Sequence, residues 1–273
     1  MSIDVLDAAG RRVRLPVFPS RIISLVPSIT ESLFALGLDE RLVGVTRYCT
    51  EPSARVAQKP KVGGQKDPDL QKIQSLQPDL IVANVEENRR EDVDALAAMG
   101  IAVYTTYPRT VEEGIVMIRD LGRMTGTEEK AGGIACSLEE VYGEISAEAA
   151  RHQPVRVFCP IWRKPYMSIN RDTYVHDVLR ICGGENIFAD KIERYPQISL
   201  AEVADLKPEV VLFPDEPYRF LPRHMRDFKP FEDAIPALRT GRTHFVDGKL
   251  LSWYGPRIGR SLRALRPLLH SSL

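Results

Sequence analysis

The sequence lacks the motifs that mark many enzyme classes and metal sites. Its 273 residues contain no G-x-S-x-G elbow, no G-x-G-x-x-G loop and no Walker phosphate loop. The five histidines show no H-E-x-x-H or other ligand spacing, and the four cysteines include no C-x-x-C pair. We therefore expect a protein that is not an enzyme and that has no metal site or covalently bound cofactor.

An excess of charge and a long apolar run are also missing. Lys plus Arg and Asp plus Glu number 37 each, so nothing favours nucleic acid or an acidic membrane surface as a partner. No stretch approaches the roughly 20 apolar residues of a membrane-spanning helix. The first residues contain no apolar run typical of a secretory leader. The composition is that of an ordinary globular protein.

Two segments 130 positions apart share one pattern. Residues 69–82 read DLQKIQSLQPDLIV, and residues 199–212 read SLAEVADLKPEVVL. In each, apolar residues spaced by three form a helix face, a proline follows, and an apolar, β-branched run then predicts a strand. A unit that recurs only once is not a solenoid repeat. The pattern instead predicts two similar α/β lobes with a ligand cleft between them.

The longest helical pattern covers residues 128–150 and has no counterpart in the repeat. Its apolar face consists of Ala131, Ile134, Leu138, Val141, Ile145 and Ala149. We predict an N-terminal lobe over residues 1–127, a connecting helix over 128–152 and a C-terminal lobe over 153–273. Because strands alternate with helices in both lobes, we expect mainly parallel sheets covered by helices.

Three shorter patterns give local predictions. Residues 3–15 have apolar residues on both sides of a turn and predict a β-hairpin. Ser28 and Glu31 have the spacing of a capping box, which predicts the start of the first helix. Residues 48–64 are polar and contain two prolines, so we expect a loop there, whereas residues 232–238 are predicted as a helix.

Aromatic and arginine side chains gather in loops next to predicted strands. In open α/β sheets the ligand crevice lies at the carboxyl ends of the strands. Aromatic rings give large rigid contact areas, and arginines bind carboxylates and phosphates. The alternative is that the rings fill the ends of the sheet as part of the core. The residues that we predict to contact ligand from these loops are Trp162, Arg163, Tyr166, Trp253, Tyr254 and Arg257.

The same segments resemble the helical-backbone periplasmic binding proteins, which receive vitamin B12, haem and ferric siderophores for ABC importers. RIISLVPSITESLFALGL is similar to the family's opening strand and helix, and LQPDLIV and LKPEVVL resemble its two lobe signatures. ICGGENIFAD followed by YPQISLAEV is very similar to the vitamin B12-binding branch. The resemblance covers nearly the whole chain and implies two lobes joined by one long helix.

The resemblance also implies ligand and partner sites. Carried over position by position, the corrinoid pocket falls on Tyr48, Tyr166 and Tyr195, and Arg171 is expected to meet polar groups of the ligand. Relatives have tryptophans where this chain has Gly64 and Asn84, so one pocket wall is less aromatic here. The family docks on a permease dimer through one glutamate per lobe. These positions fall on Gln71 and next to Glu202.

We therefore expect a monomeric solute-binding protein that captures a metal chelate for an ABC-type importer, with a corrinoid such as cobalamin or cobinamide as its ligand. A ferric-siderophore or haem receptor is the alternative within this class. The family is periplasmic or attached to the cell surface, but the missing leader leaves a cytoplasmic protein possible. A cytosolic enzyme or metal-handling protein that reuses the fold would draw on Cys159, His176, Asp215 and Glu216.

Overall fold

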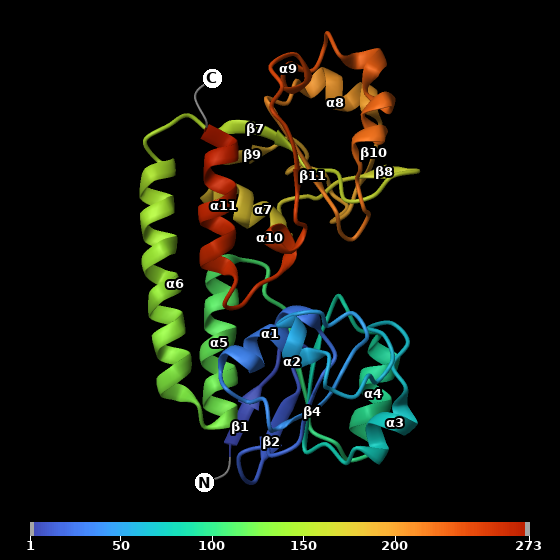
Figure 1. The fold of residues 1–273 in the computed structure, drawn as a ribbon, viewed down its shortest axis with the longest axis vertical. Helices are drawn as coiled ribbons and strands as arrows, with labels where there is room; N and C mark the ends of the chain where they lie inside the picture. The colour runs from blue at the N-terminus through green and yellow to red at the C-terminus, as the bar shows by residue number, and fades with distance from the viewer. Residues whose placement is uncertain (1–2, 271–273) are drawn as a thin grey trace. The chain divides into compact units, whose positions relative to one another are not determined.

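The computed structural model describes residues 3–270, and its contacts divide the chain into two compact units. Unit 1 contains the residues up to Pro108, Glu113–Cys136 and Tyr254–Pro256. Unit 2 contains Arg109–Glu112, Ser137–Trp253 and the residues from Arg257 onward. Each unit has its own parallel sheet covered by helices (Figure 1), which confirms the predicted fold class.

The sheet of unit 1 has four parallel strands. Its order is β4 (Leu42–Val45), β3 (Ile22–Ser24), β5 (Leu80–Asn84) and β6 (Val103–Thr106). Helices α3 (Leu70–Ser75) and α4 (Arg90–Ala98) supply Ile73, Val93 and Leu96 to the core on one face of this sheet. The remaining helices of this part of the chain are α1 (Pro27–Ala35), α2 (Ser53–Val56) and α5 (Val111–Thr125).

The predicted N-terminal hairpin is confirmed, and it covers an edge of this sheet. Strands β1 (Ile3–Leu6) and β2 (Arg12–Leu15) pair antiparallel. The buried Asp7 side chain accepts from the backbone N–H of Thr105 on β6 at 3.1 Å, and Ala8 N donates to Thr105 O at 2.9 Å. The turn of the hairpin therefore satisfies backbone groups of a strand edge that would otherwise be unpaired.

Unit 2 repeats the same strand order. Its sheet runs β9 (Gly184–Asn186), β7 (Val155–Phe158), β11 (Val210–Pro214) and β12 (Thr243–Val246), all parallel. A two-stranded antiparallel pair, β8 (Tyr166–Met167) and β10 (Gln197–Ile198), lies outside this sheet. The helices are α7 (Tyr174–Ile181), α8 (Leu200–Leu206), α9 (Pro236–Arg239), α10 (Lys249–Ser252) and α11 (Ile258–His270), with 3₁₀ turns η1 (Pro222–Asp227) and η2 (Lys229–Phe231).

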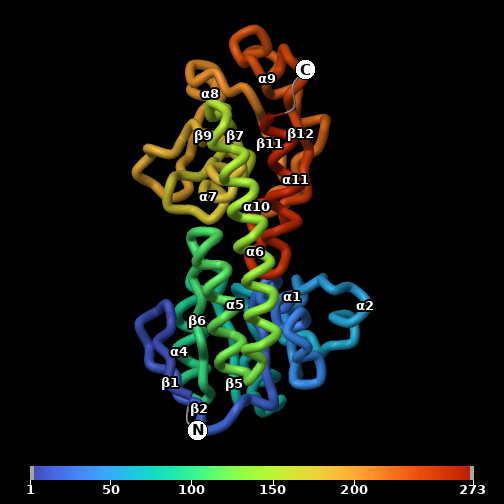
Figure 2. Tube along the Cα trace, turned by 90° about the vertical axis from the view of Figure 1, so that its left-hand side faces the viewer, coloured from blue at the N-terminus to red at the C-terminus, as the bar shows by residue number. Residues whose placement is uncertain are grey.

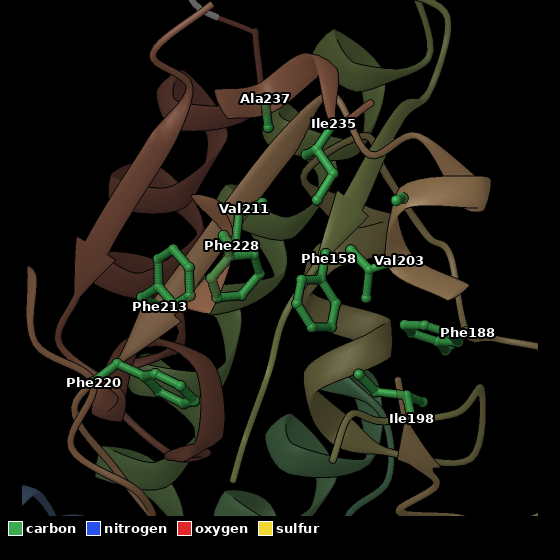
Figure 3. Close-up of a cluster of buried hydrophobic side chains, with 11 residues drawn as sticks. Phe158, Phe188, Ile198, Val203, Val211, Phe213, Phe220, Phe228, Ile235 and Ala237 are labelled. Atoms are coloured by element: carbon green, nitrogen blue, oxygen red, sulfur yellow. The ribbon is translucent and has the colours of Figure 1, made fainter. Parts of the chain in front are cut away.

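The core of unit 2 is unusually rich in phenylalanine (Figure 3). Phe158 and Phe213 point from neighbouring strands β7 and β11 toward Phe228, with ring centroids 6.4 Å and 5.4 Å from that of Phe228. Phe188 and Phe220 extend the cluster on either side. Tilted and edge-to-face rings at such distances add to the free energy of apolar burial.

The repeat has the same geometry in both units. In unit 1 the Asp79 carboxylate accepts from the backbone N–H of Ser20 at 2.8 Å and of Arg21 at 3.0 Å, just before β3. In unit 2 the Glu209 carboxylate accepts from the N–H of Arg156 on β7 at 3.0 Å. Each acidic residue therefore fixes the amino end of the adjacent strand, as the match between the two segments predicts.

Helix α6 (Glu128–Ala149) matches the predicted long helix, and the division between the units falls within it. Figures 1 and 2 show α5 and α6 side by side. Gly122 permits this packing, because a Cβ atom there would lie 2.3 Å from the Cβ of Ala131. On the unit 2 part of α6, Leu138 and Val141 pack against Gly259 of α11. The lobe boundaries at residues 127 and 152 stay a prediction.

Two local predictions were wrong. Helix α1 has Val26 at its N-cap and Pro27 in its first turn, so Ser28 and Glu31 form no capping box. Proline fits the first turn because its missing N–H has no intrahelical acceptor there. The segment 232–238 is mostly not helical, because Pro236 starts the four-residue helix α9. The predicted loop at 48–64 is mostly irregular in the structure and includes the four-residue helix α2.

One backbone feature shared by the repeats gives a stability prediction. Lys207 ends helix α8 with φ 47° and ψ 59°, and Gln77 has φ 46° at the matching position of unit 1. This left-handed conformation costs a residue with a Cβ atom roughly 1–2 kcal/mol. We expect Lys207→Gly to stabilise unit 2 by about 1 kcal/mol, measured as a higher urea midpoint by circular dichroism.

The matched control is Lys72→Gly, which places glycine inside helix α3. This variant should lower the midpoint, because glycine costs about 1 kcal/mol in a helix interior. A lower midpoint for Lys207→Gly as well would contradict the conformational explanation.

Candidate functional site

The carboxyl edge of the unit 2 sheet carries an exposed aromatic surface. Trp162 follows β7, and Tyr218 follows β11. Their ring centroids are 5.6 Å apart in an edge-to-face arrangement, and Tyr218 in turn lies 4.9 Å from Phe220. Trp162 is 43% exposed, although an indole ring is normally buried to a large extent. We call Trp162 and Tyr218 the aromatic edge.

Arg163 and Tyr166 anchor the loop that carries Trp162 through hydrogen bonds to Asp227. The Arg163 guanidinium donates to both oxygens of Asp227, from Nε at 2.7 Å and from Nη2 at 3.0 Å. The Tyr166 hydroxyl donates to Asp227 Oδ2 at 2.9 Å. Arg163 is only 10% exposed, so most of its hydrogen-bonding capacity is directed into the protein. These contacts tie the loop after β7 to η1.

The hydrogen bond from Arg163 also lowers the pKa of Asp227 below its ordinary value, with a further contribution from Tyr166. Burial raises the pKa of Tyr166, so the phenol stays protonated and remains a donor at neutral pH. Asp227 is therefore an ionised acceptor shared by two donors. This arrangement is suited to positioning the aromatic edge, and it leaves Arg163 poorly placed to bind a ligand.

The loop before the last helix has buried aromatic rings. Trp253 is 7% exposed, with Lys249 Nζ and Arg257 Cζ each 5.3 Å from its ring centroid. Tyr254 is also buried, and its hydroxyl accepts from Asn84 Nδ2 at 2.8 Å. Burial raises the pKa of Tyr254 well above its ordinary value. The alternative considered from the sequence, that rings fill the sheet ends, fits Trp253 and Tyr254 better than Trp162.

Asn84 is also buried in unit 1. Its Oδ1 accepts from the backbone N–H of Glu86 at 2.8 Å and of Glu87 at 3.2 Å. Asn88 donates from Nδ2 to Leu25 O at 3.4 Å and connects this turn to the residue that follows β3. The side chain at position 84 thus organises the loop after β5.

The carboxyl edge of the unit 1 sheet carries an ion pair next to an exposed ring. Arg47 and Tyr48 follow β4, and Tyr48 is 52% exposed. Arg47 Nη2 donates to Asp67 Oδ1 at 2.8 Å and Oδ2 at 2.7 Å, and the guanidinium lies 5.1 Å from the Tyr48 ring centroid. A Cβ atom on Gly64 would lie 2.3 Å from Asp67 Oδ1. The pair therefore occupies the space beside Gly64.

Two further predicted contact residues lie on the surface of unit 2. Arg171 forms an ion pair with Asp190, and both side chains are largely exposed. Tyr195 is exposed, with the Arg194 guanidinium 5.7 Å from its ring centroid. The nine predicted ligand residues thus fall into three groups. Tyr48, Trp162, Arg171 and Tyr195 are exposed, and Arg163 and Tyr166 are bound to Asp227 next to the aromatic edge. Trp253, Tyr254 and Arg257 are buried in the loop before α11.

The two predicted docking residues differ in their surroundings. Gln71 is exposed in the first turn of α3. Glu202 accepts from Lys191 Nζ at 2.7 Å and forms a capping box with Ser199 at the start of α8. Glu202 therefore has a structural role that explains its position without any partner, although its side chain remains partly exposed.

The four residues proposed for an enzyme differ in their burial and in the contacts that they make. Cys159 is fully buried, and burial raises its pKa to about 12, so its thiol is protonated at neutral pH. Burial also raises the pKa of Glu216, whereas Asp215 accepts from Gly248 N at 2.8 Å. His176 lies 3.5 Å from the amide of Asn186. Within residues 3–270, no group of three or more His, Cys, Asp or Glu side chains could hold a metal ion.

Two hollows of unit 2 lie away from the carboxyl edge of its sheet. One of about 280 Å³ is lined in part by Met225, Phe228 and Thr243, the first residue of β12. A second of about 270 Å³ is lined by α6 and α11 side chains that include Arg266. Both are smaller than the roughly 300–1,000 Å³ of sites for drug-sized ligands. The exposed rings are therefore the better indication of a binding surface.

Sequence reasoning missed several residues that define these edges. Tyr218, which follows β11, was not among the predicted ligand residues, and its pairing with Trp162 had no local signal. Asp227, 64 positions from Arg163, carried no signal at all. Arg47 and Asp67 flank the predicted polar loop at 48–64 on either side, and only the structure brings them together.

Two parallel α/β units with the same strand order and with exposed rings at the strand ends define a two-lobed binding protein. The chain belongs to the periplasmic binding protein family, whose model matches residues 22–245. Among curated proteins, it is 31% identical over 195 residues to a vitamin B12-binding protein of Vibrio cholerae, covering 71% of this chain and 70% of that protein. A vitamin B12-binding protein of Vibrio parahaemolyticus is 28% identical over 249 residues, covering 90% and 86% of the two chains.

Solved structures agree with this family. The crystal structure of the periplasmic vitamin B12 binding protein of Vibrio cholerae superposes with a TM-score of 0.82 at 25% identity, covering 92% of this chain and 96% of that one. A periplasmic heme-binding protein from Roseiflexus sp. RS-1 gives 0.80 at 26% identity, covering 92% and 98%. Among the described residues, no helix is long and apolar enough to cross a membrane.

The ion pair behind the aromatic edge predicts a pH-dependent loss of stability. Because the pKa of Asp227 is lower in the folded than in the unfolded state, its ionised form stabilises the fold above a pH of about 4. That contribution is lost as the pH falls through the folded-state pKa. We expect Asp227→Asn to lower the free energy of unfolding by about 1–2 kcal/mol at pH 7. The difference from the unaltered protein should shrink below a pH of about 4.

Urea denaturation at a series of pH values measures this difference. Asp190→Asn is the matched control, because it removes the same charge from the exposed pair with Arg171 and should change stability little at any pH. A deficit of Asp227→Asn that persists unchanged at a pH of about 3 would contradict the role of the ionised carboxylate.

Proposed function

We propose that this protein is a solute-binding protein that captures a metal chelate, most favourably a corrinoid such as cobinamide or cobalamin, for an ABC-type importer. The observation that carries the proposal is the aromatic edge of unit 2, where Trp162 and Tyr218 are held at the strand ends. A flat macrocycle offers such rings a broad apolar surface, and rings bury large areas with little loss of conformational entropy.

The charge at these edges favours a corrinoid over an anionic chelate. Haem carries propionate groups and catecholate chelates of iron are anionic, and arginines that are free to turn outward would bind such ligands best. Arg163 donates from Nε and Nη2 to the two oxygens of Asp227. Arg257 is buried beside Trp253. Arg171 is exposed, but its charge is balanced by Asp190. A ligand whose periphery is mostly uncharged therefore matches the exposed surface better.

A haem or ferric-siderophore receptor is the second candidate. It is favoured by the fold, because the Roseiflexus neighbour binds heme, at an identity close to that of the Vibrio cholerae vitamin B12 binding protein. In this case Arg171 and Arg194, next to Tyr195, would supply the contacts to acidic groups.

The state of the Cys159 thiol also favours a binding protein over an enzyme. The protonated, buried Cys159 thiol is a poor nucleophile, because the thiolate is the reactive form. Delivery to a permease through the surface around Gln71 and Glu202, and a periplasmic or surface location, follow from the family and are part of the same proposal.

The direct test is calorimetric titration of the purified protein with dicyanocobinamide, cyanocobalamin, haem and a ferric hydroxamate. We expect saturable binding that is tightest for the corrinoids. Trp162→Ala and Tyr218→Ala should each weaken corrinoid binding by roughly threefold to tenfold, from the aromatic contacts that they remove.

Phe18→Ala is the control, because Phe18 is also exposed but precedes the amino end of β3. It should leave the affinity unchanged. Absence of saturable binding with all four ligands would reject the proposal. Tightest binding of haem or of the ferric hydroxamate would favour the second candidate.

A further inference from the structure

The ion pair between Arg47 and Asp67 has a chemistry that neither a lone arginine nor an aromatic wall offers. Arg47 uses Nη2 for both contacts to Asp67, so its Nε–H and Nη1–H₂ groups are not used in this pair. Each Asp67 oxygen accepts one hydrogen bond from Arg47 and can accept another. The pair therefore presents donors and acceptors side by side on one surface.

The location of the pair is fixed by the backbone of unit 1. Arg47 N donates to Gly63 O at 2.8 Å, and Gly64 N donates to Asp67 O at 3.2 Å. The segment that contains Gly64 and Asp67 is joined to the loop after β5 by contacts of Gln65 with Glu87 and of Lys66 with Glu86. The pair thus lies where loops following two strands of the parallel sheet meet, at the carboxyl edge where α/β sheets bind ligands.

The space beside Gly64 is filled by this pair and not by a ring. A Cβ atom at position 64 would lie 2.3 Å from Asp67 Oδ1 and 2.8 Å from Arg47 Nη2, so a side chain there would force the ends of these two side chains to shift. Tyr48 supports the guanidinium from one side. The Arg47–Asp67 pair is therefore polar and exposed, and its two charges cancel.

We infer that the Arg47–Asp67 pair reads primary carboxamide groups on the ligand and selects against carboxylates. A carboxamide oxygen accepts from the guanidinium while its NH₂ group donates to Asp67. A carboxylate can accept from Arg47 but has no proton for Asp67, whose negative charge repels it. This inference rests on the proposed function and narrows its ligand class. The expected ligands are chelates with amide side chains, such as corrinoids, and not chelates with acidic side chains.

The test compares two corrinoids that share a ring but differ in these groups. Dicyanocobinamide carries carboxamides, whereas dicyanocobyrinic acid carries carboxylates in their place. Calorimetry with the unaltered protein should show tighter binding of dicyanocobinamide. In Asp67→Asn, the acceptor charge is lost and Arg47 is no longer neutralised. We expect the affinity for dicyanocobinamide to fall by about fivefold and that for the heptacarboxylate to rise by a similar factor.

Asp94→Asn is the matched control. Asp94 also lies in unit 1 and accepts from an arginine, Arg11 Nη2, at 2.7 Å on an exposed surface, so the variant loses the same charge at a different place. It should leave the ratio of the two affinities unchanged. Circular dichroism of both variants verifies that they are folded.

The outcomes separate this inference from the proposed function. If the unaltered protein binds dicyanocobinamide but the affinity ratio of Asp67→Asn equals that of Asp94→Asn, the carboxamide reading is wrong while the receptor function stands. If the unaltered protein binds neither corrinoid, the corrinoid proposal fails and the inference fails with it.

Discussion

Parallel strand pairing is the constraint on which the rest of the structure depends. Because parallel strands need a crossover between each pair, the loops that follow the strands all emerge at one edge of the sheet. In both units the first strand of the sheet lies inside it, with the second strand on one side and the third on the other. Thus β3 lies between β4 and β5, and β7 lies between β9 and β11. Asp79 and Glu209 fix the opposite edge by binding the backbone beside the first of these strands. The loops that follow the strands meet at the carboxyl edge, where open α/β sheets generally bind ligands.

The two units use this edge differently. Unit 2 displays rings, with Trp162 and Tyr218 supported by the ionised Asp227 and its two donors. Unit 1 displays the balanced charges of Arg47 and Asp67 beside one exposed ring. Taken separately, the surface of unit 2 suits the flat ring of the proposed ligand, and the surface of unit 1 suits polar, uncharged groups.

Most of the fold could be predicted from the sequence, because its signals are local. The repeat, the long helix ending at Ala149 and the strand Thr243–Val246 follow from apolar periodicity, which depends on near neighbours alone. The failures were also local, since prolines at 27 and 236 shifted where helices begin. The site was less predictable, because exposure and pairing depend on distant residues. Trp162 and Trp253 look alike in sequence, yet one is exposed and the other is enclosed by Lys249 and Arg257.

Hydrogen exchange of the backbone amides, with and without dicyanocobinamide, tests the central claim most directly. The claim is that ligand binding uses the loops at the carboxyl edges of both sheets. The account predicts slower exchange at residues 46–48 and 63–67 of unit 1 and at residues 160–167 and 215–219 of unit 2. Slower exchange confined to the amino edges, around Asp79 and Glu209, with these loops unchanged, would contradict it.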